Sequence, residues 1–282
     1  MTELTNPRSD RVKTVRALAG RSSRIRYGQY LVEGPQGVRE AVNHAAESIR
    51  DIYVTEAAED RYPDIFSAAR RHGLFVHTCT PEVLHAMSTD AQGMLAVVRT
   101  PETALTHLTP EYLRTVRSVA VLCQVRDPGN AGTMIRAADA AGADLVILTE
   151  DSVDVFNPKV VRSTAGSLFH LSVITNASIE ETAQALKAAG IQLLAADGYG
   201  THDLDDLLDI AHALTDNADE PDAPNLSAPT AWLFGNEAAG LSAQEKELAD
   251  ASVRVPLRGK AESLNVATAA TVCLYATSRA QR

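Results

Sequence analysis

The sequence predicts an α/β fold with two parts, a small N-terminal α/β domain and a larger domain on a mostly parallel sheet. Three observations lead to this prediction. A chain of 282 residues exceeds the common size of one domain and is comfortable for two. Short β-rich runs alternate with helical stretches along the chain. From Ser118 onward several runs are continuously apolar, as in strands buried on both faces of a parallel sheet.

The first hundred residues contain the elements of the smaller domain. Strands are expected where apolar and β-branched residues gather, and helices where apolar residues recur at helical spacing. The expected strands are residues 30–34, 49–55, 73–79 and 93–100, and the expected helices are 34–46 and 64–72. Residues 101–117 contain two prolines and no strong period. We therefore predict an N-terminal domain at residues 1–100 and a linker at 101–117.

A second alternation of strands and helices forms the larger domain, residues 118–282. Its expected strands are residues 119–125, 144–149, 169–175, 191–197, 231–237 and 251–257. Its expected helices are residues 129–143, 157–168, 179–190, 242–250 and 262–280. Residues 215–230, which are rich in proline and asparagine, are expected to form a flexible insertion.

The composition excludes several classes of protein. A hydrophobic fraction of 45% with 22% charged residues is ordinary for a globular protein and excludes a largely disordered chain. No apolar run approaches the length of a membrane span, and the N-terminus lacks the apolar core of a signal peptide. Cys79, Cys123 and Cys273 are odd in number and far apart, so we expect neither a disulfide framework nor a zinc site. These features favour a cytoplasmic protein.

The distribution of charge is more informative than the net charge of −10. Residues 8–26 carry seven basic side chains against the one acid Asp10, and residues 203–222 carry eight acids without a Lys or Arg. The basic run predicts either a solvated helix face or a surface that binds RNA phosphates, and charge alone leaves both open. Its candidate RNA-binding residues are Arg8, Arg11, Lys13, Arg16, Arg21, Arg24 and Arg26. The acidic insertion near residues 216–222 is expected to be a solvated loop that faces away from RNA.

Three segments carry glycine, asparagine and charged residues where a strand is followed by a helix. They are Asp127–Gly142, Leu233–Ser242 and Val255–Ala270. In open α/β sheets ligands bind at this carboxyl edge. Taken singly, each segment is explained by turns and helix caps, and none matches a GxGxxG or P-loop pattern. We expect Asn130 to cap its helix and Asn265 to lie in the first turn of the closing helix.

The three segments in this order are more specific evidence of function than any one of them alone. N-x-G-x-x-x-R-x-A starts at Asn130, F-G-N-E-x-x-G at Phe234, and P-(x6)-S-L-N at Pro256. Together they resemble the three-motif signature of the SpoU (TrmH) family of SPOUT RNA methyltransferases, and the resemblance covers residues 118–282. The upstream runs YLVEGPQGVREA and STDAQGMLAVV resemble the small substrate-binding domain that precedes the catalytic domain in many members.

The resemblance implies a deep trefoil knot in the larger domain, a homodimer that completes the site, and methyl transfer from S-adenosyl-L-methionine to a ribose 2′-hydroxyl of RNA. Ribosomal RNA is the first expectation and transfer RNA the alternative. The resemblance also implies that the cofactor is held mainly by backbone groups, and that no metal is needed. The implied cofactor-binding residues are Gly235, Asn236, Val255, Leu257 and Leu264. The implied catalytic residues are Arg136, Asn130, Glu237, Ser263 and Asn265.

The implied roles differ among these residues. Arg136 would position and polarise the target nucleotide, since a guanidinium with a pKa above about 12 is a poor free base. Asn130 would hold Arg136 or the ribose, and Glu237 would fix its loop or contact the ligand on the dimer side. Ser263 and Asn265 would shape the knot and the edge that meets the substrate.

Two hypotheses of other classes stand beside this one. The first is a catalytically inactive RNA-binding or ribosome-assembly factor on the same fold. The intact motif residues disfavour this hypothesis. The second is an unrelated small-molecule enzyme, which the lack of a nucleotide fingerprint disfavours. The eight histidines are scattered in the sequence, so we expect surface or packing positions for them. Cys123, Cys273 and Trp232 are expected in the core.

Overall fold

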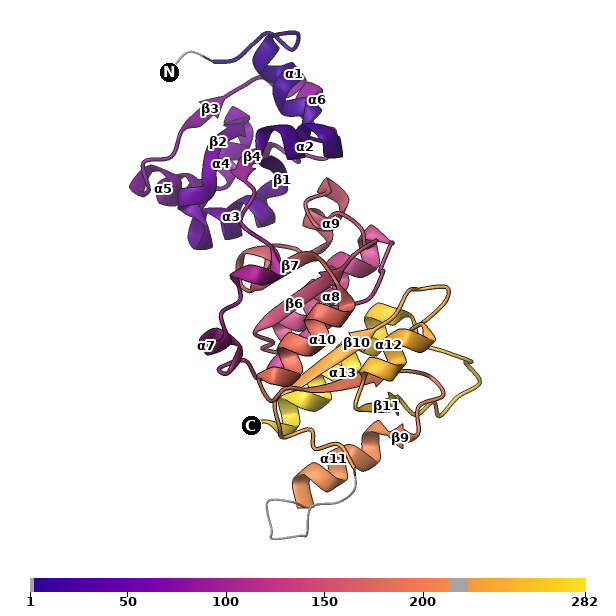
Figure 1. Cartoon of the computed structure of the whole chain (residues 1–282). Helices are drawn as coiled ribbons and strands as arrows, with labels where there is room; N and C mark the ends of the chain where they lie inside the picture. Colours follow the sequence, from indigo (N-terminus) through magenta and orange to yellow (C-terminus); the bar gives the residue numbers. More distant parts are fainter. Residues whose placement is uncertain (1–2, 214–222) are drawn as a thin grey trace. The chain divides into compact units, whose positions relative to one another are not determined.

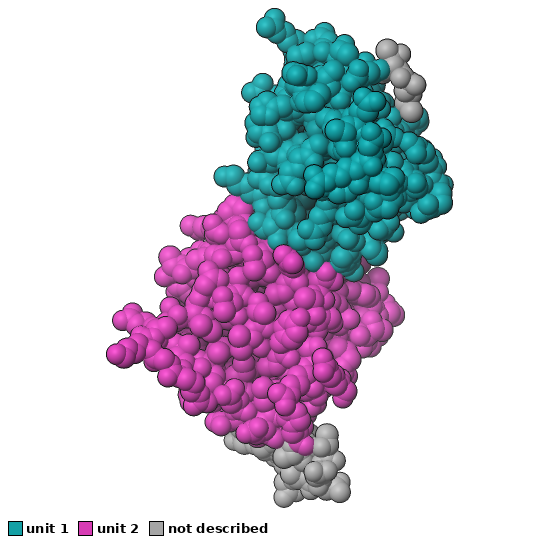
Figure 2. All heavy atoms as spheres, turned by 180° about the vertical axis from the view of Figure 1, so that it is seen from behind, with its two compact units in different colours: residues 1–102, 154–170 teal, residues 103–153, 171–282 magenta. Residues whose placement is uncertain are grey.

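A computed structural model describes residues 3–213 and 223–282. The chain folds into two compact units, which Figure 2 shows in different colours. The first unit comprises residues 1–102 together with 154–170, and the second comprises 103–153 together with 171–282. The domain boundaries expected from the sequence, at residues 100 and 118, stay a prediction.

The first unit contains a four-stranded mixed sheet. Its order is β1-β4-β2-β3, in which β4 pairs antiparallel with β1 and β2, and β3 pairs parallel with β2. The strands are β1 (Gln29–Glu33), β2 (Ile49–Val54), β3 (Val76–Thr78) and β4 (Met94–Arg99). The helices are α1 (Asp10–Ala17), α2 (Arg21–Tyr27), α3 (Gly34–His44), α4 (Glu56–Arg61), α5 (Pro63–Arg71), α6 (Pro81–Met87) and α9 (Pro158–Ser163). All four expected strands are confirmed, whereas the short helices α4 and α6 had no sequence prediction.

The second unit contains a seven-stranded sheet in which every strand pair is parallel. Its order is β7-β6-β5-β10-β8-β11-β9. Figure 1 labels β6, β7, β9, β10 and β11 of this sheet. The strands are β5 (Ser118–Leu122), β6 (Leu145–Thr149), β7 (Ser172–Ala177), β8 (Gln192–Ala196), β9 (His202–Asp203), β10 (Thr230–Phe234) and β11 (Ala251–Arg254). The helices are α7 (Pro110–Leu113), α8 (Pro128–Ala140), α10 (Ile179–Ala188), α11 (Leu204–Ala213), α12 (Ala243–Leu248) and α13 (Val266–Ala280). The predicted mostly parallel sheet is confirmed, and the trefoil knot stays a prediction.

Helices cover both faces of this parallel sheet, as its apolar strands require. Val121 of β5 packs in one cluster with Leu186 of α10. On the other face Trp232 of β10 donates its indole N–H to the Thr277 hydroxyl of α13, at 2.8 Å. The expected core position of Trp232 is confirmed. Within the described residues, no helix is long and apolar enough to cross a membrane.

The three cysteines are unpaired and buried. Burial raises the pKa of the Cys273 thiol to about 12 and that of Cys79 to about 11. It raises the pKa of Cys123 as well. At neutral pH all three are therefore protonated, and a thiol in this form is a poor nucleophile. The predicted packing role of Cys123 and Cys273 is confirmed.

One helix of the second unit had no sequence prediction, and one helix of the first unit is shorter than predicted. The first half of the acidic stretch forms helix α11, because Leu204, Leu207 and Ala211 recur at helical spacing and are buried. The remainder of that stretch, residues 214–222, lies outside the described residues. The helix expected over residues 157–168 ends at Ser163, since Ala165 and Gly166 have positive φ angles of 52° and 105°. A Cβ at Gly166 would lie 2.3 Å from the Cγ of Glu40, so only glycine fits there.

Candidate active site

The candidate site lies at the carboxyl edge of the parallel sheet in the second unit. The loop into α8 follows β5, and other loops follow β8, β10 and β11. Because β10 pairs with β5 and β8, and β8 pairs with β11, the four loops emerge from neighbouring strands. The three segments singled out in the sequence are therefore adjacent in space.

The N-terminus of α8 is capped by Asp127. Its Oδ1 accepts a hydrogen bond from the Asn130 backbone N–H at 2.8 Å, so Asp127 is the N-cap. The expectation that Asn130 caps this helix is wrong. Asn130 lies inside the first turn, since α8 begins at Pro128, and its side chain is free to bond elsewhere.

Glu237 joins the loop after β10 to the loop before α8. Its Oε1 accepts from the Asp127 backbone N–H at 3.0 Å and from the Asn130 amide at 3.3 Å. Its Oε2 accepts from the Arg126 backbone N–H at 3.3 Å. The carboxylate thus satisfies two backbone donors that precede the helix and fixes the side chain of Asn130.

The surroundings of Glu237 favour its ionised form. Partial burial raises the pKa of this carboxyl, but the backbone N–H groups and the Asn130 amide that donate to it outweigh burial and lower the pKa overall. A carboxylate with a lowered pKa accepts a proton poorly at neutral pH. Of the roles considered for Glu237, the geometry favours fixing the loop.

Asn265 connects the third segment to the same group of residues. Its Oδ1 accepts from the backbone N–H groups of Ala267 and Thr268, so Asn265 caps α13. It does so from the N-cap position, directly before the first turn in which the sequence placed it. Its Nδ2 donates to the Asn130 Oδ1 at 3.1 Å. Asn265, Asn130 and Glu237 therefore form one continuous hydrogen-bonded chain, which we call the motif junction.

The loop after β10 is closed on itself. The backbones of Asn236 and Gly240 exchange two hydrogen bonds of 3.0 and 2.8 Å, and Gly240 has a φ of 68°. A Cβ at Gly235 would lie 2.2 Å from the Gly240 carbonyl carbon, so the close approach requires glycine. The Asn236 amide donates to the Gln124 carbonyl at 2.9 Å. The FGNE segment is thus a rigid turn anchored to the end of β5.

Two predicted catalytic residues stand apart from the motif junction. Arg136 and Ser263 are both exposed, and within the described residues neither side chain makes a hydrogen bond or ion pair. No hydrogen bond joins Asn130 to Arg136 among the described residues, because the Asn130 amide bonds Glu237 and Asn265. Arg136 is therefore presented outward from α8. The other role expected for Asn130, holding the ribose, stays a prediction.

The predicted cofactor residues after β11 lie in an open loop. Within the described residues, no backbone–backbone hydrogen bond links Pro256–Leu264 to the rest of the chain, which leaves its N–H and C=O groups available to a ligand. Val255 and Leu264 are half-buried, and Leu257 is 39% exposed.

The neighbouring loop after β8 was not predicted to belong to the site. Tyr199 in that loop is 96% exposed, although it is a large aromatic residue. A Cβ at Gly200 would lie 2.6 Å from the Val253 carbonyl carbon, so this loop lies directly against β11. The sequence DGYG at residues 197–200, directly after an apolar strand, was the available signal.

In the first unit, the basic run is only partly a free surface. Arg24 is 5% exposed and bonds Asp154 at 2.6 Å and the Ala19 carbonyl at 2.7 Å, so its prediction as an RNA-binding residue is wrong. Lys13 pairs with Asp10. Arg8, Arg11, Arg16, Arg21 and Arg26 are exposed, as the prediction requires.

Two of the scattered histidines meet in the first unit. His44 and His170 both lie beside the Glu40 carboxylate, at 3.4 and 3.2 Å, with their rings edge to face. This is the one group of metal-ligand type among the described residues, and none of its members belongs to the three motifs.

Comparisons with known proteins agree with this geometry. The model of the SpoU rRNA Methylase family matches residues 117–275, and the model described as RNA 2′-O ribose methyltransferase substrate binding matches residues 31–104. A 23S rRNA (guanosine(2553)-2′-O)-methyltransferase of Bacillus subtilis is 33% identical over 98% of both chains. A 23S rRNA (uridine(2479)-2′-O)-methyltransferase of Streptomyces viridochromogenes is 30% identical over 95% of this chain and 89% of its own.

Solved structures are similar over nearly the whole chain. The SpoU methyltransferase AviRb of Streptomyces viridochromogenes in complex with AdoMet superposes with a TM-score of 0.77 at 30% identity, covering 96% of this chain and 98% of its own. The AdoMet-bound rRNA methyltransferase of Sinorhizobium meliloti gives a TM-score of 0.76 at 26% identity, covering 99% and 97%.

Proposed function

This chain belongs to the SpoU rRNA methylase family, and we propose that it transfers a methyl group from S-adenosyl-L-methionine to a ribose 2′-hydroxyl of 23S ribosomal RNA. The observation that carries the proposal is the motif junction. Asn130, Glu237 and Asn265, which are up to 135 positions apart in sequence, are joined there by direct hydrogen bonds. Relatives that act on 23S rRNA align over almost the full length of the chain.

The loops at the sheet edge fit the cofactor. Gly235 begins a rigid turn that packs closely against Gly240 at the sheet edge, and Pro256–Leu264 offers backbone groups without a backbone partner among the described residues. Leu257 and Tyr199 add exposed apolar surface from the two neighbouring strand ends, which suits the adenine ring. We propose Gly235, Asn236, Val255, Leu257 and Leu264 as cofactor-binding residues.

The cofactor supplies a methyl group bonded to a positively charged sulfur, which is already electrophilic. The protein must therefore hold the ribose oxygen in line with that methyl group and polarise its hydroxyl. We assign this positioning to Arg136, whose free guanidinium can donate two parallel hydrogen bonds to phosphate or ribose oxygens. Glu237 and Asn265 hold Asn130 and the two loops in place. Ser263, exposed in the loop before α13, is proposed to line the substrate edge.

We propose that the active enzyme is a homodimer. Thr268, Val272, Tyr275 and Arg279 form an exposed stripe along α13, and the large apolar side chains of Val272 and Tyr275 lie at its centre. Arg136 is exposed on α8, which packs against α13. A second copy that covers this stripe would bring its own loops to the Arg136 side chain and would form a twofold interface, the commonest kind in soluble proteins.

We also propose that methyl transfer needs no metal and takes place in the cytoplasm. The sulfonium group needs no Lewis acid, and the residues of the motif junction are amides and a single carboxylate. Methyl transfer unaffected by EDTA, in wild type and in His44→Ala alike, is the expected result. A fluorescent fusion that co-fractionates with ribosomal particles would support the location, and one found outside the cell would contradict it.

The function is tested by mapping ribose methylation in a strain that lacks the gene. We expect one 2′-O-methyl mark to disappear from 23S rRNA relative to the parent strain and to return on complementation with wild type but not with Arg136→Ala. Loss of a mark in transfer RNA instead would support the alternative substrate. An unchanged methylation pattern in both RNAs would favour the inactive RNA-binding factor.

A further inference from the structure

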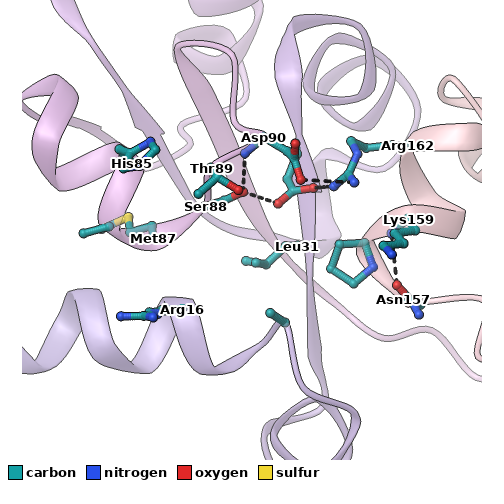
Figure 3. Close-up of a pocket in the computed structure, with 14 residues that line it drawn as sticks. Arg16, Leu31, His85, Met87, Ser88, Thr89, Asp90, Asn157, Lys159 and Arg162 are labelled. Carbon is teal, nitrogen blue, oxygen red and sulfur yellow. Dashed lines mark hydrogen bonds and ion pairs between the residues drawn. The ribbon is translucent and has the colours of Figure 1, made fainter.

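One cavity of the first unit has no role in the function proposed so far. It has a volume of about 470 Å³, within the range of roughly 300 to 1,000 Å³ common for ligand sites. Residues of α1, β1, α6 and the start of α9 surround it (Figure 3). Leu31, Met87 and Pro158 provide apolar surface in its wall. The cavity is therefore large enough for a nucleoside and partly apolar, as a base-binding pocket must be.

One wall of the cavity carries a fixed polar group. The Glu33 side chain is only 4% exposed, and its two oxygens are bonded to the Ser88 hydroxyl and to Arg162. The second terminal nitrogen of Arg162 reaches Asp90 at 3.1 Å. Figure 3 shows these side chains converging at one side of the cavity. Asp90 uses one oxygen for Arg162, and the other can accept from the N–H groups of a base.

Two cations on other sides of the cavity have no acidic partner. Arg16 extends from α1 and Lys159 from the start of α9, and Figure 3 shows them on opposite sides of Leu31. Both are exposed, and within the described residues neither side chain makes an ion pair. By contrast, Lys13 and Arg24 of the same basic run are paired with Asp10 and Asp154. Arg16 and Lys159 are thus available for phosphate.

We propose that this cavity binds one unpaired nucleotide of the RNA substrate, with its base on Leu31, Met87 and Pro158 and its phosphates between Arg16 and Lys159. The proposal rests on the proposed function for the identity of the RNA. A pocket of this kind recognises RNA through an extruded base, whereas the exposed arginines of α1 and α2 contact only the backbone. The N-terminal unit would then select the target by shape and by one base, separately from the catalytic loops.

The proposal is tested by removing the cations and, independently, by filling the cavity. Arg16→Ala combined with Lys159→Ala removes two phosphate contacts, so the slope of log K against log salt should become shallower by about 1.4, at about 0.7 per contact on single strands. At 0.1 M salt this corresponds to roughly 10- to 30-fold weaker binding. Ala19→Trp fills the cavity from an exposed position and should weaken binding roughly 5- to 100-fold by excluding the base.

The probe is an unmodified 23S rRNA transcript, and two matched controls accompany it. Arg71→Ala removes an exposed arginine of α5, and Ala17→Trp adds a bulky side chain at an exposed position of α1, in each case outside the cavity lining. Both controls should bind as wild type does. In a transcript that carries 4-thiouridine, photocrosslinking should attach RNA to the peptide that contains Met87, and Ala19→Trp should abolish that crosslink.

The outcomes separate this proposal from the proposed function. Wild-type affinity and salt slope in both cavity variants would overturn the nucleotide pocket, even if wild type methylates 23S rRNA normally. Binding of free GMP or AMP as tight as that of the transcript would overturn it in favour of a mononucleotide site. If wild type transfers no methyl group but the cavity variants still weaken RNA binding selectively, the proposed function fails and the pocket stands.

Discussion

Replacing Glu237 by glutamine tests whether this residue fixes the motif junction or accepts a proton. The side chain keeps its shape, and its remaining oxygen can still accept from Asp127 and the Asn130 amide. The new NH₂ group, however, would face the Arg126 backbone N–H, and two donors cannot bond. Hydrogen bonds to charged groups contribute about 1.5–3 kcal/mol when buried, and water replaces part of this at an exposed site. We expect a loss of about 1 kcal/mol.

The expected consequences follow from that magnitude. A loss of about 1 kcal/mol lowers the melting temperature by about 2–4 °C in a domain of this size. A loop displaced by about 1 Å should lower the single-turnover rate roughly 100-fold and should also weaken cofactor binding. Glu247→Gln, on the exposed surface of α12, is the matched control and should change neither quantity.

The pH dependence distinguishes the two roles. Because folding lowers the pKa of Glu237, its stabilising contribution is present above the ordinary carboxyl value of 4.5 and is lost as pH falls through the lowered pKa. Between pH 6 and 9 the methyl-transfer rate of wild type should therefore show no titration of Glu237. The pH profiles of wild type and Glu237→Gln should have the same shape. A rate that rises with a pKa near neutrality in wild type and becomes flat in Glu237→Gln, with cofactor affinity unchanged, would refute the positioning role.

Three further predictions concern other parts of the chain. Arg136→Ala should lower single-turnover methyl transfer about 100- to 1,000-fold while calorimetry shows unchanged cofactor binding, and Arg136→Lys should recover little because it lacks the forked donors; normal turnover would remove Arg136 from the site. Thr277→Val should cost about 1–3 kcal/mol in urea unfolding, since it leaves the buried Trp232 N–H without an acceptor, and an unchanged midpoint would contradict this account. Changing Arg8, Arg21 and Arg26 together to alanine should weaken RNA binding and make the slope of log K against log salt shallower by roughly 0.7–0.9 per residue, with cofactor affinity unchanged. Equal slopes in this variant and wild type would mean that the basic run is only a solvated face.

The fold and the position of the site could be predicted because both depend on local patterns. Apolar runs identified the buried strands, and residues that follow the carboxyl ends of neighbouring parallel strands must meet at one edge. The bonds within the motif junction could not be predicted, because Asn130 and Asn265 are far apart in sequence and each also suits a helix cap. Which of the two roles an asparagine takes depends on tertiary geometry.

Charge patterns were less reliable than apolar patterns. Arg24 belongs to a run that looks uniformly solvated, but its partner Asp154 lies 130 positions away and buries it. Deleting residues 1–28 would remove the core residues Val12 and Leu18 and expose residues of the same cluster such as Leu31, so single substitutions are the better test of this surface. Likewise, the helical spacing of Leu204 and Leu207, which are buried in α11, was not recognised because acidic residues lie between them.

The most direct test of the central claim is a single-turnover reaction with the purified full-length protein, labelled S-adenosyl-L-methionine and 23S rRNA from a strain that lacks the gene. The account predicts label at one ribose 2′-oxygen, dependent on Arg136 and insensitive to EDTA. Label on a base, label in transfer RNA alone, or no transfer by a protein that binds the cofactor would contradict it.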